Sequence, residues 1–357
     1  MTGLGTLVAL GAWLFASLVQ LATAQSLVLE RRIDLPSVHG RIDHMAVDLE
    51  GQRLFVAALA ADSLEVVDLR EGQRASSITA LHEPQGVLYV GSLKRLLIAN
   101  GAGGGVQAFN DARAPVSASQ ASLDDADNLR QDPLNGDVYV GAGKALVRLD
   151  PDTLRVLQRI DLAGHPESFQ IERAGGRIYV NVPTAGHIAV VDRQSGKVEA
   201  TWPIKSAARN FPMALDEQGH RLFVVTRSPA LLIVHDTESG REIDRVPACG
   251  DADDLFFDSA RHQLYVVCGE GQVAVIRPEG RHFVVSERVP TAAGARTGLF
   301  VPSLSTLFVA VPARTSPAEL RAYVVRSHHL TRTPTEPFTD ASTLASPPAL
   351  HLRPISP

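Results

Sequence analysis

A short apolar segment recurs seven times along the chain, and this repeat constrains the fold more than any other feature. Successive copies are 40 to 44 residues apart, and their central residues are Phe55, Leu97, Tyr139, Tyr179, Phe223, Tyr265 and Phe308. Each copy is rich in β-branched and aromatic residues and is flanked by Gly, Asn, Asp or Ser, as in RIYVNV (177–182). That is the pattern of a β-strand, so the sequence predicts seven copies of one small β unit.

Each unit contains more than this one strand. A second apolar strand follows, as in HIAVVD (187–192), then a turn such as DRQSGK (192–197), then a polar alternating strand such as KVEATWPI (197–204). With the strand before each copy, this makes four strands per unit. Seven such units predict an all-β fold, a seven-bladed β-propeller with four-stranded antiparallel blades. No helical pattern of ten residues interrupts the repeat, which argues against parallel α/β folds.

The two ends of the repeat complement each other. The seventh unit ends after its third strand, at Val325, whereas the segment LVLERRIDL (27–35) has the polar alternation of a fourth strand. We predict that 27–35 pairs beside 319–325 and closes the ring, because closure removes a sheet edge. The propeller is therefore expected to span residues 25–326.

The segments outside the repeat predict an exported protein. Residues 1–24 have no charged side chain, are apolar over most of their length and end in Ala-Thr-Ala, as a signal peptide with a cleavage site does. An uncleaved membrane anchor is the alternative, since about 20 apolar residues can span a bilayer. Cleavage predicts a periplasmic or secreted protein without a membrane span. Residues 327–357 contain six prolines and no apolar periodicity, which predicts a disordered tail.

The chain contains two cysteines, Cys249 and Cys268, which the repeat register places near each other. A disulfide is permitted in an exported protein. Two small buried thiols are the alternative. The sequence leaves both possibilities open.

One unit has a recognisable signature. The fourth, GGRIYVNVPTAGHIAVVDRQSGKVEAT (175–201), resembles the YVTN-type β-propeller repeat, in which a Tyr-Val strand precedes an Asn, a Val-rich strand ends in Asp and a Ser/Thr-Gly turn follows. The fifth, HRLFVVTRSPALLIVHDTESGREI (220–243), is similar. The resemblance covers residues 27–326, includes the exported YncE-like propellers and implies the same fold. It implies no particular activity, because propellers serve as binding modules and as enzymes.

Polar residues precede the innermost strand of every unit. The repeat aligns them in one register: RIDHM (41–45), EPQGV (83–87), DADNL (125–129), HPESF (165–169), RNFPM (209–213), DADDL (251–255) and ARTGL (295–299). Because innermost strands line the axis of a propeller, we expect these residues to ring one mouth of the axial channel. The candidate ligand-binding residues are Asp43, His44, Glu83, Gln85, Asn128, Asn210, Asp254 and Arg296.

The charges in this ring are unevenly distributed. We expect Arg209 and Arg296 to pair with Asp251, Asp253 and Asp254 of the sixth unit. Acids of the other units have fewer cationic partners, so the sequence predicts a cation there, Ca²⁺ or Mg²⁺. The candidate metal ligands are Glu83, Asp127, Asn128, His165 and Glu167. The alternative is a structural channel whose polar residues only bind water.

These observations lead to two hypotheses for the function. The first is an exported, monomeric propeller that binds a cation, a polar small ligand or a protein partner at the mouth without catalysis. The second is a metal-dependent hydrolase of lactonase type, in which the cation polarises a carbonyl and His44 or His165 serves as base. The net charge of −5 gives no basis for nucleic-acid binding.

Overall fold

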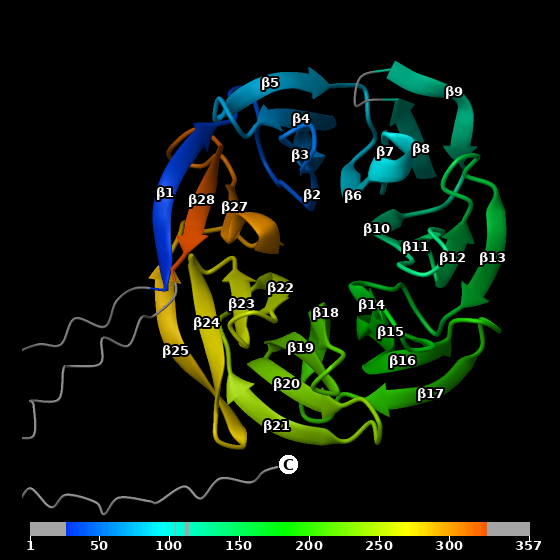
Figure 1. Cartoon of the computed structure of the whole chain (residues 1–357), viewed down its shortest axis with the longest axis vertical. Helices are drawn as coiled ribbons and strands as arrows, with labels where there is room; N and C mark the ends of the chain where they lie inside the picture. Colours follow the sequence, from blue (N-terminus) through cyan, green and yellow to red (C-terminus); the bar gives the residue numbers. More distant parts are fainter. Residues whose placement is uncertain (1–25, 104, 111–113, 327–357) are drawn as a thin grey trace, which may run out of the picture. The chain divides into compact units, whose positions relative to one another are not determined.

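The computed structural model describes residues 26–103, 105–110 and 114–326. Within them, seven four-stranded antiparallel sheets are arranged as blades around one axis (Figure 1). The predicted all-β, seven-bladed propeller is therefore confirmed. The predicted signal peptide (1–24) and tail (327–357) lie outside the described residues. In the described part of the chain, no helix is long and apolar enough to cross a membrane.

The two inner strands of each blade follow the repeat. The innermost strands of blades 1 to 7 are β2 (Met45–Asp48), β6 (Pro84–Val90), β10 (Ala126–Gln131), β14 (Phe169–Ile171), β18 (Ala208–Asp216), β22 (Ala252–Asp258) and β26 (Gly298–Val301). The second strands are the apolar copies themselves: β3 (Arg53–Ala58), β7 (Arg95–Asn100), β11 (Val138–Ala142), β15 (Arg177–Val182), β19 (Arg221–Ser228), β23 (Gln263–Cys268) and β27 (Thr306–Val311). All seven central residues of these copies are buried.

The two outer strands complete the blades. The third strands are β4 (Ser63–Asp68), β8 (Gly105–Asn110), β12 (Ala145–Leu149), β16 (His187–Asp192), β20 (Ala230–Asp236), β24 (Gln272–Glu279) and β28 (Glu319–Val325). The fourth strands of blades 1 to 6 are β5 (Gln73–Ile78), β9 (Ala114–Ala121), β13 (Val156–Asp161), β17 (Val198–Pro203), β21 (Glu242–Pro247) and β25 (His282–Pro290). Exposed and half-buried residues alternate along β5, as expected for an outer strand.

The hydrophobic core lies in the seams between neighbouring blades. Phe223 of blade 5 packs against Phe257 and Phe283 of blade 6, with ring centroids 5.6 and 5.3 Å apart. Tyr265 of blade 6 contacts Phe300 of blade 7 in the same way, at 5.0 Å. Because aromatic residues bury large areas, these contacts hold each blade at a fixed angle to the next.

The ring is closed by the N-terminal strand, as predicted. Strand β1 (Leu27–Asp34) pairs antiparallel with β28, with Leu27 opposite Val325 and Asp34 opposite Glu319. Blade 7 therefore has the strand order β1-β28-β27-β26. Leu27 is fully buried, so closure contributes apolar packing as well as hydrogen bonds.

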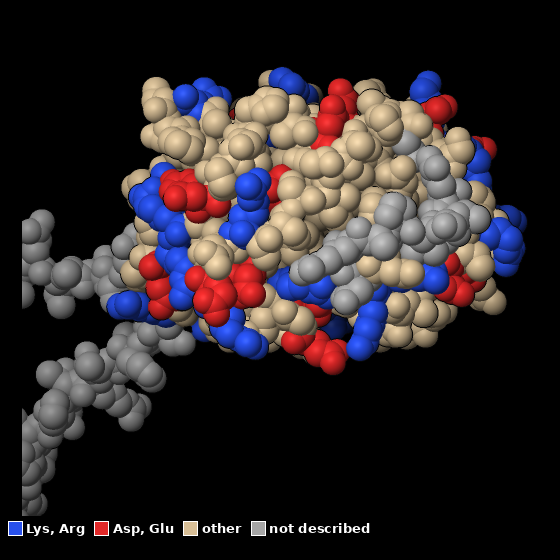
Figure 2. All heavy atoms as spheres, turned by 90° about the horizontal axis from the view of Figure 1, so that it is seen from above, with Lys and Arg blue, Asp and Glu red and all other residues tan. Residues whose placement is uncertain are grey.

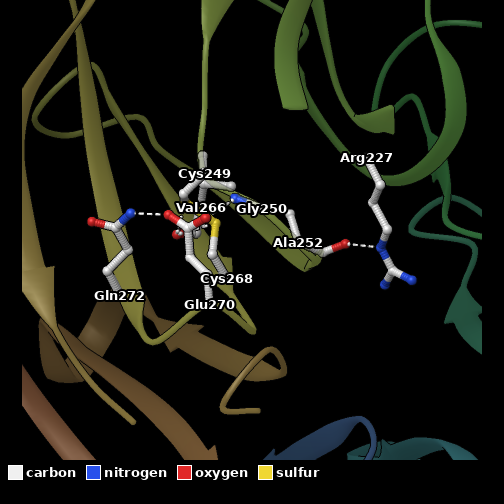
Figure 3. The surroundings of a disulfide bond; sticks show 8 residues. All are labelled: Arg227, Cys249, Gly250, Ala252, Val266, Cys268, Glu270 and Gln272. Atoms are coloured by element: carbon white, nitrogen blue, oxygen red, sulfur yellow. Dashed lines mark hydrogen bonds between the residues drawn. A yellow bond between two sulfur atoms is a disulfide. The ribbon is translucent and has the colours of Figure 1, made fainter. Parts of the chain in front are cut away.

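The two cysteines form a disulfide, which decides between the two alternatives that the sequence left open. Cys249 and Cys268 are joined with a Cα–Cα distance of 5.9 Å. Cys268 ends β23 opposite Ala252, the first residue of β22. The bond thus fastens the segment that enters β22, beside the point that Arg227 reaches from blade 5 (Figure 3).

We predict that this disulfide stabilises the propeller substantially. The bond closes a loop with a sequence separation of 19 residues, for which the loss of unfolded-state entropy is worth about 3 kcal/mol. The double variant Cys249→Ala/Cys268→Ala should lower the free energy of unfolding in urea by that order, and the unreduced wild type should show no reactive thiol. Equal stability of variant and wild type would contradict this role.

Candidate functional site

The backbone turns sharply where the chain enters the innermost strands. In four blades the first residue of the aligned register has a positive φ, between 47° and 64°; these residues are Glu83, Asp125, Arg209 and Asp251. Such angles are uncommon for residues other than glycine. The same innermost strands also contain register shifts against their neighbours, as between Ala252 and Asp254. Bulges of this kind change the direction of side chains. Here they lie at the axial mouth, the name that we give to the seven aligned segments.

The third residue of the register is a carboxylate in four of the seven blades: Asp43, Asp127, Glu167 and Asp253. Burial raises the pKa of Asp43 to about 7, although His44 and Arg41 act to lower it. Burial, followed by the negative charge of Asp127, likewise raises the pKa of Glu167 to about 7. Acids from separate blades therefore lie close enough to affect each other's ionisation.

His44 lies within ion-pair distance of carboxylates from three blades. Its Nε2 lies 3.7 Å from Asp43 and 3.9 Å from Asp127, and its Nδ1 lies 3.5 Å from Asp254. These carboxylates come from blades 1, 3 and 6. Burial alone would lower the pKa of His44, but the charges of Asp254 and Asp43 outweigh it and raise this pKa to about 10. His44 is therefore a cation at neutral pH.

Asp43 is the most deeply buried acid of the axial mouth, with no exposed surface. Arg41 Nη2 lies 2.7 Å from its Oδ2, which is close enough for an ion pair. However, neither oxygen of Asp43 accepts a well-aligned hydrogen bond from a described residue. Asp43 thus has a cationic partner in Arg41, but its oxygens lack well-aligned hydrogen-bond donors.

The acids of blade 6 are paired with arginines, but only one of the two arginines is the expected one. Arg296 Nε lies 2.9 Å from Asp253, and its Nη1 lies 3.3 Å from Asp251. Arg209 is exposed and forms none of the ion pairs of this group. Its predicted place is taken by Arg227, which bonds the Asp253 carboxylate and donates from Nε to the Ala252 carbonyl at 2.8 Å.

The importance of Arg227 is not apparent from the register of the innermost strands, because this arginine lies at the end of a second strand. That end reaches the same mouth, since the first two strands of a blade are antiparallel. Arg227 also stacks on Phe211, with its guanidinium carbon 4.0 Å from the ring centroid. One signal in the sequence could have revealed it. Among the seven residues that follow the aligned apolar copies, Arg227 alone is charged: Leu59, Gly101, Gly143, Pro183, Arg227, Gly269 and Pro312.

His165 and its neighbours form the opposite side of the mouth. His165 Nδ1 lies 2.9 Å from the Gly143 carbonyl and 3.3 Å from Asp125, and its Nε2 lies 4.0 Å from Asp127. Burial opposes protonation of His165, but the nearby carboxylates of Asp127 and Asp125 raise its pKa to about 9. Asn128 is buried beside them, and its amide lies 3.5 Å from Asp127.

Three candidate residues lie apart from this cluster. Glu83 is exposed, and its backbone N–H donates to Asp62. Gln85 is half-buried against Gly101. Asn210 is fully buried in the seam between blades 4 and 5, where its amide donates to Asn181 at 2.9 Å.

The remaining candidate residues lie close together at the axial mouth. Asp254 contacts His44 and accepts a hydrogen bond from the Gly298 backbone N–H at 2.8 Å. The structure thus brings together Asp43, His44, Asp127, Asn128, His165, Glu167, Asp254 and Arg296. Within residues 26–103, 105–110 and 114–326, no group of three or more His, Cys, Asp or Glu side chains has an arrangement suited to a metal ion.

Comparison with known proteins supports the fold alone. No family model matches the chain, and no curated protein matches it. Among solved structures, a chain of hydrazine synthase from Kuenenia stuttgartiensis is similar, with a TM-score of 0.69 and 15% sequence identity. The match covers 78% of this chain and 94% of that chain. The chain therefore has a β-propeller fold, and its membership of the YVTN-type repeat family stays a prediction.

Proposed function

We propose that this chain is a binding propeller that holds a small, polar, charged molecule at the axial mouth and does not catalyse a reaction. The observation that carries the proposal is Asp43, a fully buried carboxylate whose oxygens accept no well-aligned hydrogen bond from a described residue. Buried polar groups are nearly always hydrogen-bonded, because leaving one unsatisfied costs about 1–3 kcal/mol. The incomplete hydrogen bonding of Asp43 supports a site in which a polar ligand, bound to its exposed partner Arg41, completes this group of charges.

The charges around Asp43 favour a ligand that carries polar groups of its own. Arg41 and His44 provide positive charge beside it, while Asp127 and Asp254 lie within 4 Å of His44. Donors and acceptors are therefore close together. Asp43 itself has no exposed surface, so the ligand would contact Arg41, whose side chain is 42% exposed and whose Nη2 lies 2.7 Å from Asp43.

The lactonase hypothesis required a general base, and neither candidate is suited to that role. The pKa values of His44 and His165 are raised to about 10 and about 9. Both imidazoles therefore hold their protons near pH 7, whereas a general base must have a free lone pair at the working pH. Binding without catalysis agrees better with this chemistry.

A divalent cation, Ca²⁺ or Mg²⁺, is the competing ligand. Both ions prefer several oxygen ligands. Asp127 and Glu167 could supply oxygens, but the positively charged His165 lies beside them and Glu83 lies elsewhere. The polar small molecule is therefore the better-supported ligand, and one experiment compares the two.

We also propose that the protein is exported to the periplasm or secreted, and that it acts as a monomer. Export is supported by the apolar segment 1–24 and by the Cys249–Cys268 disulfide, which an oxidising compartment maintains.

We predict that ligand binding depends on Asp43. In a thermal-shift screen of polar metabolites, CaCl₂ and MgCl₂, a ligand present at 100 times its Kd should raise the Tm of the wild type by about 3 °C or more. Asp43→Asn keeps the shape and removes the charge, so this shift should be largely lost.

The matched control for that experiment is Asp161→Asn, which alters an outer-strand aspartate whose side chain is 86% exposed. It should respond to the ligand as the wild type does. A screen in which no compound stabilises the wild type, or in which Asp43→Asn responds equally, would contradict the proposed function.

We predict that Glu167 makes the propeller less stable as the pH rises. The folded pKa of Glu167, about 7, exceeds its ordinary value of 4.5, so the folded state binds more protons between these values. Its stabilising contribution is complete below pH 4.5 and is lost as the pH rises through 7. Glu167→Gln should lessen the fall in unfolding free energy between pH 4.5 and 7 by about 1 kcal/mol or more.

Urea unfolding at several pH values measures this effect. Glu238→Gln changes a glutamate whose side chain is 74% exposed and should leave the pH profile of the wild type unchanged. If Glu167→Gln and the wild type lose stability in parallel, then Glu167 does not titrate in this window.

A further inference from the structure

An open pocket of about 360 Å³ lies at the axial mouth, where blades 6, 7 and 1 meet. We call it the arginine pocket, because its charged lining consists of three arginines and one aspartate: Arg41, Arg296, Arg314 and Asp251. Its volume is near the lower end of the range for small-molecule sites, about 300–1,000 Å³. The size fits a small molecule.

Two of these arginines are held by ion pairs with nearby acids. Arg296 is paired through Nε with Asp253 and through Nη1 with Asp251. The ion-pair contacts of Arg41 run from Nη2, which lies 2.7 Å from Asp43 and 3.9 Å from Asp253. A guanidinium has five N–H donors, so the other nitrogens of Arg41 keep donors for a ligand. Arg41 and Arg296 are thus positioned before any ligand arrives.

Arg314 has a different environment. No carboxylate of the described residues lies within ion-pair distance of its guanidinium. The group rests against Gly294, where a Cβ atom would come within 2.9 Å of Nη2 and 3.0 Å of Nε. Gly294 has a φ of 85°, so the backbone conformation and the close approach both suit glycine. An exposed arginine is therefore accommodated beside two others without an acid of its own.

We propose that the arginine pocket binds a small organic anion that carries a carboxylate, held by Arg314 on one side and Arg41 on the other. Arg314 gives the pocket a positive charge that no carboxylate of the described residues neutralises, whereas Arg41 and Arg296 are paired with acids. The planar guanidinium matches a carboxylate in bidentate geometry, which lysine cannot do. This inference rests on the proposed function and names the class of ligand for the same mouth.

The positive charge of the pocket contrasts with the charge of the whole chain. The chain as a whole has a net charge of −5. On the face drawn in Figure 2, basic and acidic side chains lie interspersed and form no continuous basic surface. A polyanion such as nucleic acid needs an extended basic patch. A discrete small anion is therefore the better match.

Calorimetric titration of the full purified chain with succinate, in Tris buffer at low salt, tests the proposal. Succinate should bind, whereas its uncharged diamide analogue, succinamide, should not. Arg314→Gln should weaken succinate binding about 10-fold or more, because it removes charge-assisted hydrogen bonds to the carboxylate. Arg314→Lys should recover part of the affinity. The control is Arg281→Gln, an exposed arginine in the turn between β24 and β25, which should bind like the wild type.

Four outcomes would overturn the proposal. They are a lack of succinate binding, equal binding of succinamide, unchanged affinity in Arg314→Gln, and tighter binding of inorganic phosphate than of succinate. If succinate fails while another polar molecule or a cation still requires Asp43, the proposed function stands and only the anion assignment is wrong. If nothing binds in either experiment, both proposals fail.

Discussion

The innermost strands of all seven blades converge on one axis, and this convergence determines what the polar residues before them can do. Charged side chains from repeats that are far apart in sequence come within ion-pair distance of each other, as His44 does with Asp127 and Asp254. Their charges cannot be fully hydrated there, because the blades pack closely on all sides. Every acid at the axis must therefore be paired, protonated or in contact with a bound molecule.

The structure shows the first two solutions, and the third is the one that we propose for Asp43. Asp253 is paired with Arg227 and Arg296. Glu167 and Asp43 have pKa values raised to about 7, so each holds a proton for much of the time near neutral pH. Asp43 in addition lacks hydrogen-bond donors from the described residues. Buried ion pairs contribute little net stability, since desolvation offsets their attraction. Such a cluster therefore agrees with the binding role that we propose.

The fold could be predicted from the sequence because it depends on a periodic signal. Seven buried aromatic or aliphatic centres, from Phe55 to Phe308, set the number of blades, and the missing fourth strand identified 27–35 as the closing strand. The candidate site was predictable only in part. The register of the innermost strands revealed Asp43, His44 and Asp127, which do meet.

The rest depended on features that a register does not contain. Arg227 belongs to a second strand, and its role follows from the antiparallel pairing that returns this strand to the mouth. Glu83 occupies the aligned position yet is exposed, because the side-chain direction depends on the backbone angle at that residue. Arg314 lies in a loop between β27 and β28, and only the close approach of Gly294 places it at the pocket. Spacing predicts which blade a residue belongs to, whereas local dihedral angles decide where its side chain points.

The pairing of β1 with β28 also has a kinetic consequence. Leu27 is synthesised near the start of the domain and Val325 near its end, so this contact is among the most distant in sequence that the fold contains. Contacts of this kind form slowly, because a long loop must close first. Six blades can assemble from local hairpins while the seventh waits for its fourth strand. During that time β28 offers an unpaired edge to β1 of any neighbouring molecule, and an exchange of this strand between two chains would give an intertwined dimer. Because β28 is synthesised last, ring closure is the folding step most sensitive to the concentration of neighbouring unfinished chains.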